Sequence, residues 1–272
     1  MKKVKIVLST STLAVIAIII LMPFYLMIMM STYQSNELYT GIKFVPGTYL
    51  LENLKMVFIF SNYTTFYRNS LIIATCSTVL SVFSSAMAGF AFSKYNFRFK
   101  KGLYLFVVAV MMIPGQLGMV AFLIQMNWFG WMNTFLPLIV PAIANSFGVF
   151  WMTQFMNSSL PAEIIESARI DGASEIRIFI QIALPFIKAA IITLSLLSFL
   201  GAWNSYMMPM LILNRLSLFT VPLGLTTLAD TYKQNIGAQI TALSVGTLPI
   251  VVLFAIGSKY FIRGLVAGAL KG

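Results

Sequence analysis

The chain has no histidine, a single cysteine and only seven acidic residues among its 272. Without histidine there is no imidazole to bind a metal or to act as a general base. The lone Cys76 excludes an internal disulfide framework and a cysteine-rich metal site. No GxxxxGK[ST] phosphate loop occurs, so we expect the chain not to bind ATP on its own. The sequence therefore predicts a protein that holds neither metal nor cofactor.

What the chain has instead is apolar surface. Hydrophobic residues make up 59% of it, charged residues only 9%, and the mean hydropathy is +0.90. The net charge of +11 could suggest nucleic acid. However, the basic residues form short groups beside apolar runs, a pattern typical of proteins oriented in a membrane. We therefore predict an all-α membrane protein, surrounded by lipid and without a nucleic-acid partner.

Apolar runs are long enough for six membrane-spanning helices, since a helix needs about 20 residues to cross the hydrocarbon core. The first follows Lys2, Lys3 and Lys5, as in a signal peptide, but it is longer than a signal core and has no A-x-A cleavage site. We interpret it as a retained helix. The six expected spans are residues 6–30, 69–93, 103–125, 134–156, 186–213 and 241–262.

Charge orients these spans. With both termini in the cytoplasm, the inner side carries thirteen of the eighteen Lys and Arg residues, as the positive-inside rule requires. We expect one transmembrane domain over residues 1–272. Its parts are a first helix and outer loop (1–64), a core (about 65–262), an inner, coupling loop (158–186) within that core, and a cytoplasmic tail (263–272).

The inner loop, residues 158–186, is called the charged loop below because it holds four of the seven acidic residues. Asp171-Gly172 is a turn signal, which predicts two short helices joined by a turn. Leu184-Pro185 is expected to end the element. Two interpretations are open: an interfacial helix with solvated charges, or a docking element for another protein. The residues expected to share one apolar face are Ile165, Ala168, Gly172, Ile176 and Phe179.

The spacing E-x-A-x3-G-x9-I-x-L-P from Glu166 to Pro185 resembles the EAA loop of permease subunits in bacterial ABC importers. Further segments resemble the carbohydrate branch of that family, above all the six-helix partner subunit of maltose-type importers. The resemblance covers nearly the whole chain, and Ser167 departs from the usual alanine. The segments that carry it are residues 66–71, 112–116, 201–204 and 260–272.

This resemblance implies a type I ABC permease fold whose EAA loop forms coupling helices, and a location in a bacterial plasma (inner) membrane. It also implies three partners: a second permease in a heterodimer, a cytoplasmic ATPase dimer that binds the ATP and Mg, and an extracytoplasmic sugar-binding protein. Glu166 is expected to pair with a basic residue of the ATPase. The tail is expected to touch the ATPase dimer, with a frayed terminus as the alternative. The expected docking residues are Glu166, Ser167, Ala168, Asp171, Gly172, Ala173, Ile182, Leu184 and Pro185.

Two other segments are candidates for solute handling. Trp203, Asn204 and Tyr206 could contact a sugar, or could serve only helix packing. By resemblance, an outer loop meets the binding protein, with candidates Thr231, Tyr232, Lys233 and Gln234.

Other functions remain as alternatives. An ABC permease for a peptide or phosphate ester would share the charged loop. An ion-coupled secondary transporter normally needs ionisable residues within its spans, where this sequence has almost none. An intramembrane enzyme would need clustered carboxylates or metal ligands, which the sequence does not show. We therefore expect a non-catalytic transport subunit.

Overall fold

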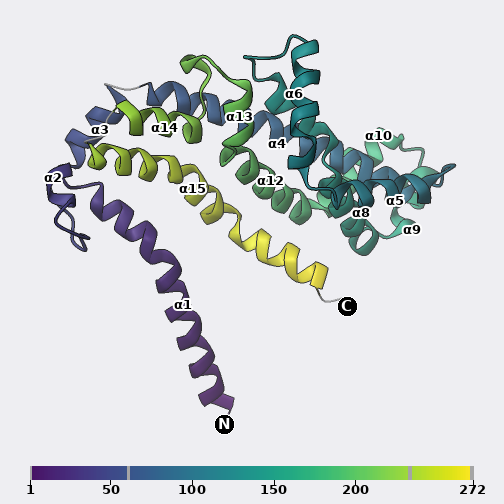
Figure 1. The fold of residues 1–272 in the computed structure, drawn as a ribbon. Coiled ribbons are helices and arrows are strands. Elements are labelled where there is room, and N and C mark those ends of the chain that lie inside the picture. The colour runs from purple at the N-terminus through teal and green to yellow at the C-terminus, as the bar shows by residue number, and fades with distance from the viewer. Residues whose placement is uncertain (1, 60–61, 232–234, 270–272) are drawn as a thin grey trace. The chain divides into compact units, whose positions relative to one another are not determined.

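The computed structural model describes residues 2–59, 62–231 and 235–269, and all the regular structure within them is helical (Figure 1). The chain divides into two compact units. Unit 1 comprises residues 1–67 and 223–249, and unit 2 comprises residues 68–222 and 250–272. The prediction of an all-α fold is confirmed.

Unit 1 contains α1 (Lys2–Met30), α2 (Ser35–Leu38), α3 (Leu50–Phe58) and the adjoining parts of three longer elements: α4 (Tyr63–Lys94), α14 (Val221–Thr231) and α15 (Ile236–Ala269). Its polar interior centres on Asn53, whose side-chain amide donates to the carbonyls of Ser31 and Tyr33 at 2.9 Å each. The Tyr63 hydroxyl donates to the carbonyl of Ala242. These bonds join the end of α1, α3, α4 and α15, so unit 1 is held by satisfied buried polar groups.

Unit 2 contains the rest of α4 and most of the spans. In chain order its further elements are α5 (Lys100–Met111), η1 (Gly115–Gly118), α6 (Met119–Trp128), α7 (Leu136–Ile139), η2 (Val140–Ala144), α8 (Ser146–Ser159), α9 (Ala162–Ile170), α10 (Glu175–Arg177), the π-helix η3 (Ile178–Ala183), α11 (Leu184–Phe186), α12 (Lys188–Trp203), α13 (Met207–Ile212) and η4 (Leu216–Leu218).

Helix α8 lies at the centre of unit 2. Gly89 lets α4 approach it closely, because a Cβ at that position would stand 2.6 Å from Cβ of Met152. On another side the Trp151 indole donates to the carbonyl of Ala190 in α12 at 3.2 Å. Lys94, at the end of α4, donates to the carbonyl of Leu160 and so satisfies a group at the end of α8. The helices that carry the charged loop therefore pack on a common core.

The lengths and hydropathy of the helices show which of them could cross a membrane. Among the described residues, four helical segments are long and apolar enough to span: Ile6–Met30, Tyr63–Lys94, Leu136–Ser159 and Ile236–Ser258. Two bent pairs raise the number to six if each pair is a single span. Four of the six predicted spans are thus confirmed as long helical segments, and the third and fifth overlap the two bent pairs.

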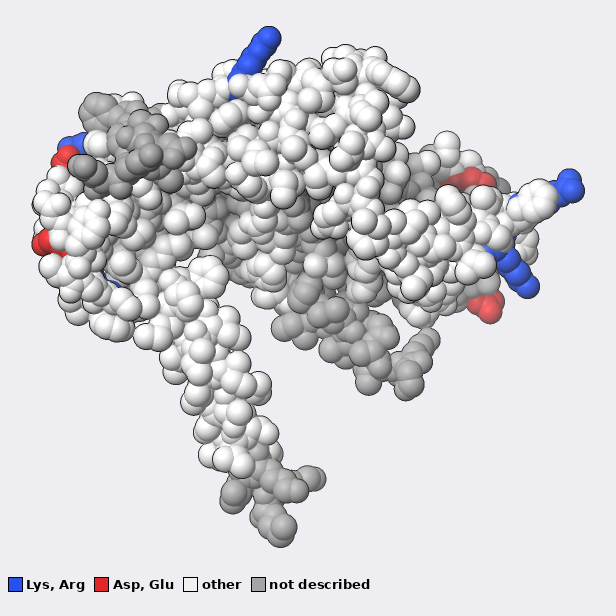
Figure 2. All heavy atoms as spheres, viewed as in Figure 1, with Lys and Arg blue, Asp and Glu red and all other residues white. Residues whose placement is uncertain are grey.

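The third predicted span bends by 89° between α5 and the segment Gly115–Trp128. Pro114 stands at this break, where its missing N–H cannot continue the hydrogen-bond ladder of α5. In the region of the fifth predicted span, the segment Glu175–Phe186 meets α12 at 80°. Figure 2 shows a largely uncharged surface on the face drawn, as expected for a protein bordered by lipid.

Candidate functional site

The charged loop begins with α9, and a glycine sets where that helix ends. The Gly172 N–H donates to the carbonyl of Arg169, and the Ala173 N–H to the carbonyl of Ala168, each at 3.0 Å. Gly172 has φ +79°. This is the Schellman arrangement, in which the residue after the C-cap adopts the left-handed conformation that glycine tolerates best. The two short helices and the turn predicted at Asp171-Gly172 are present.

The loop is anchored to unit 2 by its apolar side. Ile165 is 2% exposed and lies with Ala168 and Phe179 in one buried cluster, which also includes Phe90 of α4 and Met156 of α8. The rings of Phe90 and Phe179 have centroids 5.5 Å apart. Three members of the predicted docking set, Ala173, Ile182 and Leu184, are partly buried against this cluster.

A fourth member, Ala168, is buried in the cluster itself, and the other five, Glu166, Ser167, Asp171, Gly172 and Pro185, are exposed. So are two large apolar side chains, Ile170 at 86% and Ile176 at 73%. The expectation that Ile176 shares the buried face of Ile165 is wrong. Because the positive φ of Gly172 turns the chain, a spacing counted along one helix does not continue into α10.

A polar contact ties the loop to the end of α4. Arg169 Nε lies 2.7 Å from Oε1 of Glu175, and the Tyr95 hydroxyl donates to Oε2 of the same carboxylate. Arg169 also lies over the Tyr95 ring, 5.4 Å from its centroid. The hydrogen bond from Arg169, followed by that from Tyr95, holds the pKa of Glu175 below its usual value. We call these three residues the Tyr95 contact.

Sequence reasoning missed the Tyr95 contact. Tyr95 follows Lys94 in a short basic connection, and nothing in the residue pattern links it to Glu175, eighty positions away. On the face drawn in Figure 2, charged side chains of both signs gather around the end formed by α5, α9 and α10. The charged loop thus combines a buried anchor with an exposed, mixed-charge surface.

The end of the charged loop differs from the prediction. Pro185 does not stop the helical path: it lies in the first turn of α11, where proline is tolerated because its N–H is not needed. The break comes two residues later at Ile187, with φ −98° and ψ 17°. The π-helix η3 directly precedes α11. The charged loop therefore runs into α12 through a sharp bend.

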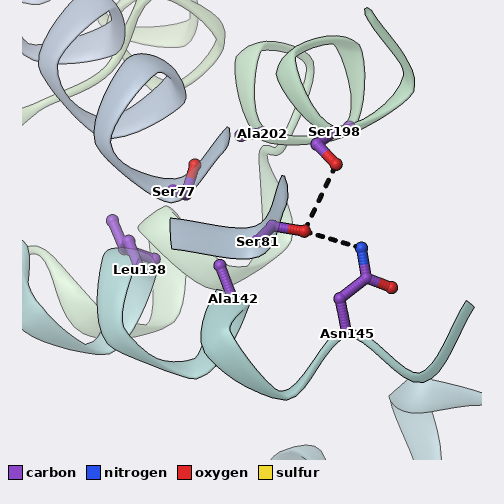
Figure 3. Close-up of a pocket in the computed structure, with 8 residues that line it drawn as sticks. Ser77, Ser81, Leu138, Ala142, Asn145, Ser198 and Ala202 are labelled. Carbon is purple, nitrogen blue, oxygen red and sulfur yellow. Dashed lines mark hydrogen bonds between the residues drawn. The ribbon is translucent and has the colours of Figure 1, made fainter. Parts of the chain in front are cut away.

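A second candidate site is a cavity of about 300 Å³ in unit 2, called the serine cavity below (Figure 3). Its polar wall joins three parts of the chain. Asn145 Nδ2 donates to Ser81 Oγ at 2.7 Å, and Ser81 Oγ lies 3.4 Å from Ser198 Oγ. The Asn145 side-chain oxygen accepts the N–H of Gly148 at 2.9 Å and so caps α8.

Sequence reasoning also missed the serine cavity. Ser77 and Ser81 are four residues apart on α4, which places them on one face of the helix. That spacing is the available signal, whereas their meeting with Asn145 and Ser198 depends on packing between helices. Gly201 lines the cavity as well, and a Cβ built there meets no atom within 4 Å.

The residues predicted to contact solute have different surroundings. Trp203 is only 2% exposed and its ring stacks on Phe199, with centroids 5.6 Å apart and planes 14° apart. Asn204 and Tyr206, by contrast, are exposed. Thr231 ends α14, while Tyr232, Lys233 and Gln234 lie outside the described residues. Within the described residues, no group of three or more His, Cys, Asp or Glu side chains could hold a metal ion.

Comparison with known proteins places these features in context. Residues 81–267 match the family model described as the inner membrane component of binding-protein-dependent transport systems. The chain is 34% identical to the arabinooligosaccharides transport system permease protein AraQ of Halalkalibacterium halodurans, covering 97% of this chain and 96% of the relative. It is 32% identical to the trehalose/maltose transport system permease protein MalG of Thermococcus litoralis, covering 94% and 93%.

The fold agrees. A crystal structure of a bacterial ABC transporter involved in the import of the acidic polysaccharide alginate contains a chain that matches with a TM-score of 0.82, covering 95% of this chain and 97% of that one at 20% identity. The charged loop, the apolar spans and the family match over most of the chain lead to one conclusion. This chain belongs to the family of inner membrane components of binding-protein-dependent transport systems.

Proposed function

We propose that this chain is one of two permease subunits of an ATP-driven importer for a sugar or oligosaccharide. It forms half of the translocation pore, with both termini in the cytoplasm. A separate ATPase dimer binds ATP and Mg, and an extracytoplasmic binding protein delivers the solute. The chain itself is non-catalytic and couples the ATPase to the pore.

The architecture of the charged loop carries this proposal. Its inner side is fixed in the core of unit 2 through Ile165 and Phe179, while Glu166, Ile170 and Ile176 project outward. Two exposed apolar side chains together with an exposed carboxylate suit a protein groove with a basic rim better than a lipid headgroup layer. Amphipathic helices that lie in a headgroup layer usually carry Lys and Arg, whereas this loop exposes a carboxylate. We assign this surface to the ATPase.

The solute class follows from the relatives. Those described above are named for arabinooligosaccharides and for trehalose/maltose, and another, 26% identical, is the lactose transport system permease protein LacG of Rhizobium radiobacter. The exposed residues Asn204 and Tyr206 and the buried Trp203 remain candidates for the solute path. Thr231 to Gln234 remain candidates for contact with the binding protein, and residues 263–272 for contact with the ATPase.

The test is reconstitution of the complete complex. The chain is purified with its second permease and ATPase, placed in proteoliposomes, and supplied with the binding protein and a panel of neutral oligosaccharides of arabinose, xylose, glucose and galactose. We expect uptake of at least one member that requires both ATP and the binding protein. Uptake driven by an ion gradient without ATP, or uptake of none of the panel, would contradict the proposal.

A further inference from the structure

The serine cavity lies near the middle of two spans, and Ser198 joins it from α12. Ser77 and Ser81 are close to the centre of the 32-residue helix α4, and Asn145 interrupts the span Leu136–Ser159. At mid-span a polar side chain has no water or headgroup to bind, so it is retained where it meets a partner or a solute path. The meeting of four uncharged polar side chains from three helices at this cavity therefore indicates a packing contact or a solute path.

The backbone is also broken here. Asn145 is extended, with φ −77° and ψ 93°, between η2 and α8. Within a membrane such breaks persist where they are buried in protein or line an aqueous cavity. Discontinuous helices near the bilayer midplane are a recurring way to build solute sites in transporters. Asn145 both caps the new helix and turns its amide toward Ser81, so the break and the cavity are one construction (Figure 3).

The lining sets the chemistry of a ligand. Its polar groups are the hydroxyls of Ser77, Ser81 and Ser198 and the amide of Asn145, with Leu138 and Ala142 on the apolar wall. The lining contains no ionisable side chain, so an ion or a charged solute would lack a counter-charge. Hydroxyls and amides can donate and accept, as the hydroxyls of a sugar require, while an apolar wall suits the C–H face of a sugar ring.

The volume of the serine cavity and the hydrogen-bonding capacity of Ser198 are also compatible with a sugar unit. A cavity of about 300 Å³ is at the lower end of the range for small-molecule sites. Among the described residues, the contact of Ser198 Oγ is the long one of 3.4 Å with Ser81, so the Ser198 hydroxyl can turn to a ligand at little cost. Gly201 leaves open space where any other residue would place a side chain.

We propose that the serine cavity is a subsite on this subunit for one unit of a neutral sugar in transit, bound through Ser81, Asn145 and Ser198. This inference rests on the proposed function and adds to it. It assigns solute contact to residues other than Trp203, Asn204 and Tyr206.

The principal test fills the cavity without disturbing its polar bonds. In the reconstituted complex, Gly201→Leu should lower uptake of the sugar transported by wild type at least tenfold. ATP hydrolysis stimulated by the binding protein should stay within about twofold. Gly102→Leu is the matched control, because Gly102 also lies in a helix with nothing within 4 Å of its Cβ, and it should transport normally. Copurification of the second permease and the ATPase verifies assembly.

A second variant guards against misassembly of the first. Ser198→Ala removes one hydroxyl and no bulk, and loss of one hydrogen bond to the sugar should weaken apparent affinity about twofold to tenfold. Ser198→Thr keeps a hydroxyl and should restore part of that affinity. A role confined to helix packing would instead lower the thermal stability of the complex and leave affinity unchanged.

The outcomes are distinguishable. Wild-type uptake together with unchanged transport by Gly201→Leu, or with unchanged affinity in Ser198→Ala, overturns the subsite and leaves the proposed function standing. Absence of ATP-dependent sugar uptake by the wild-type complex overturns the proposed function and the subsite together.

Discussion

Replacing Gly172 by alanine should loosen the charged loop without creating a clash inside the subunit. A Cβ at this position meets no atom within 4 Å, so the effect comes from the backbone alone. With φ +79°, an alanine would adopt the left-handed conformation at a cost of about 1–2 kcal/mol. A cost of that size raises the population of the opened turn about fivefold to thirtyfold.

Hydrogen exchange measures this opening directly. The N–H groups of Gly172 and Ala173 close the end of α9, so their exchange rates report the turn. We expect Gly172→Ala to speed exchange over residues 170–174 by that factor and to reduce sugar uptake per ATP hydrolysed. Gly102→Ala should leave exchange in the charged loop unchanged.

Asparagine separates two explanations for a glycine here. Because asparagine tolerates the left-handed conformation, Gly172→Asn should keep wild-type exchange in the loop. If its uptake is also normal, Gly172 serves the turn alone. If uptake is lost while exchange is normal, the added side chain blocks approach of the ATPase, and the larger side chain of Gly172→Leu should then abolish uptake as well. Wild-type exchange rates in Gly172→Ala would refute the reasoning from the positive φ.

Three further predictions concern the same unit. Glu166→Arg should uncouple ATP hydrolysis from uptake while the protein still reaches the membrane. The proposed docking would bury the pair of Glu166 with a basic residue of the ATPase, and stranding one partner of a buried pair costs about 3–5 kcal/mol. The bond from Arg169 lowers the pKa of Glu175 in the folded loop. Its stabilisation of the loop is therefore fully present above the ordinary carboxyl pKa of about 4.3, and is lost as the pH falls through the lower pKa of the folded state. Exchange of the loop measured from pH 3 to 7 should show this loss, worth less than about 1 kcal/mol for an exposed pair. Gly89→Val should lower the melting temperature of the purified complex through overpacking of about 1–3 kcal/mol, because α4 and α8 meet there.

Each has a matched control. Glu163→Arg changes a neighbouring carboxylate on α9, outside the docking set, and should leave uptake coupled. Glu175→Gln should abolish the pH dependence of exchange in the loop. Gly102→Val adds the same bulk at an open position and should melt close to wild type. Normal coupling in Glu166→Arg would remove that residue from the mechanism.

The local features of the charged loop were predictable because they depend on neighbours in sequence. The turn at Asp171-Gly172 follows from a glycine after a helical segment, and the short helices on either side follow from composition. The prediction that Ile176 lies on the buried face was wrong, because a periodicity of three and four assumes one continuous helix. The prediction that the element ends at Pro185 was wrong, because proline is unfavourable inside a helix but acceptable in its first turn.

Contacts between distant segments were not predictable from one sequence. The approach of Tyr95 to Glu175 and of Ser81 to Asn145 and Ser198 depends on how the helices of unit 2 pack. Nor does a tryptophan near the end of an apolar run reveal whether its ring is free or, as for Trp203, stacked on Phe199. The bend at Pro114 could be expected as an interruption, but its 89° angle could not.

Helix α4 carries Ser81 on the serine cavity and, just beyond its end, Tyr95, hydrogen-bonded to the charged loop. Fourteen residues separate them, or about 21 Å at a rise of 1.5 Å per residue. A tilt of about 10° in a lever arm of that length would displace one end by roughly 3–4 Å relative to the other. A movement of the charged loop that displaces Tyr95 would thus shift α4 at the serine cavity by about the width of a sugar hydroxyl.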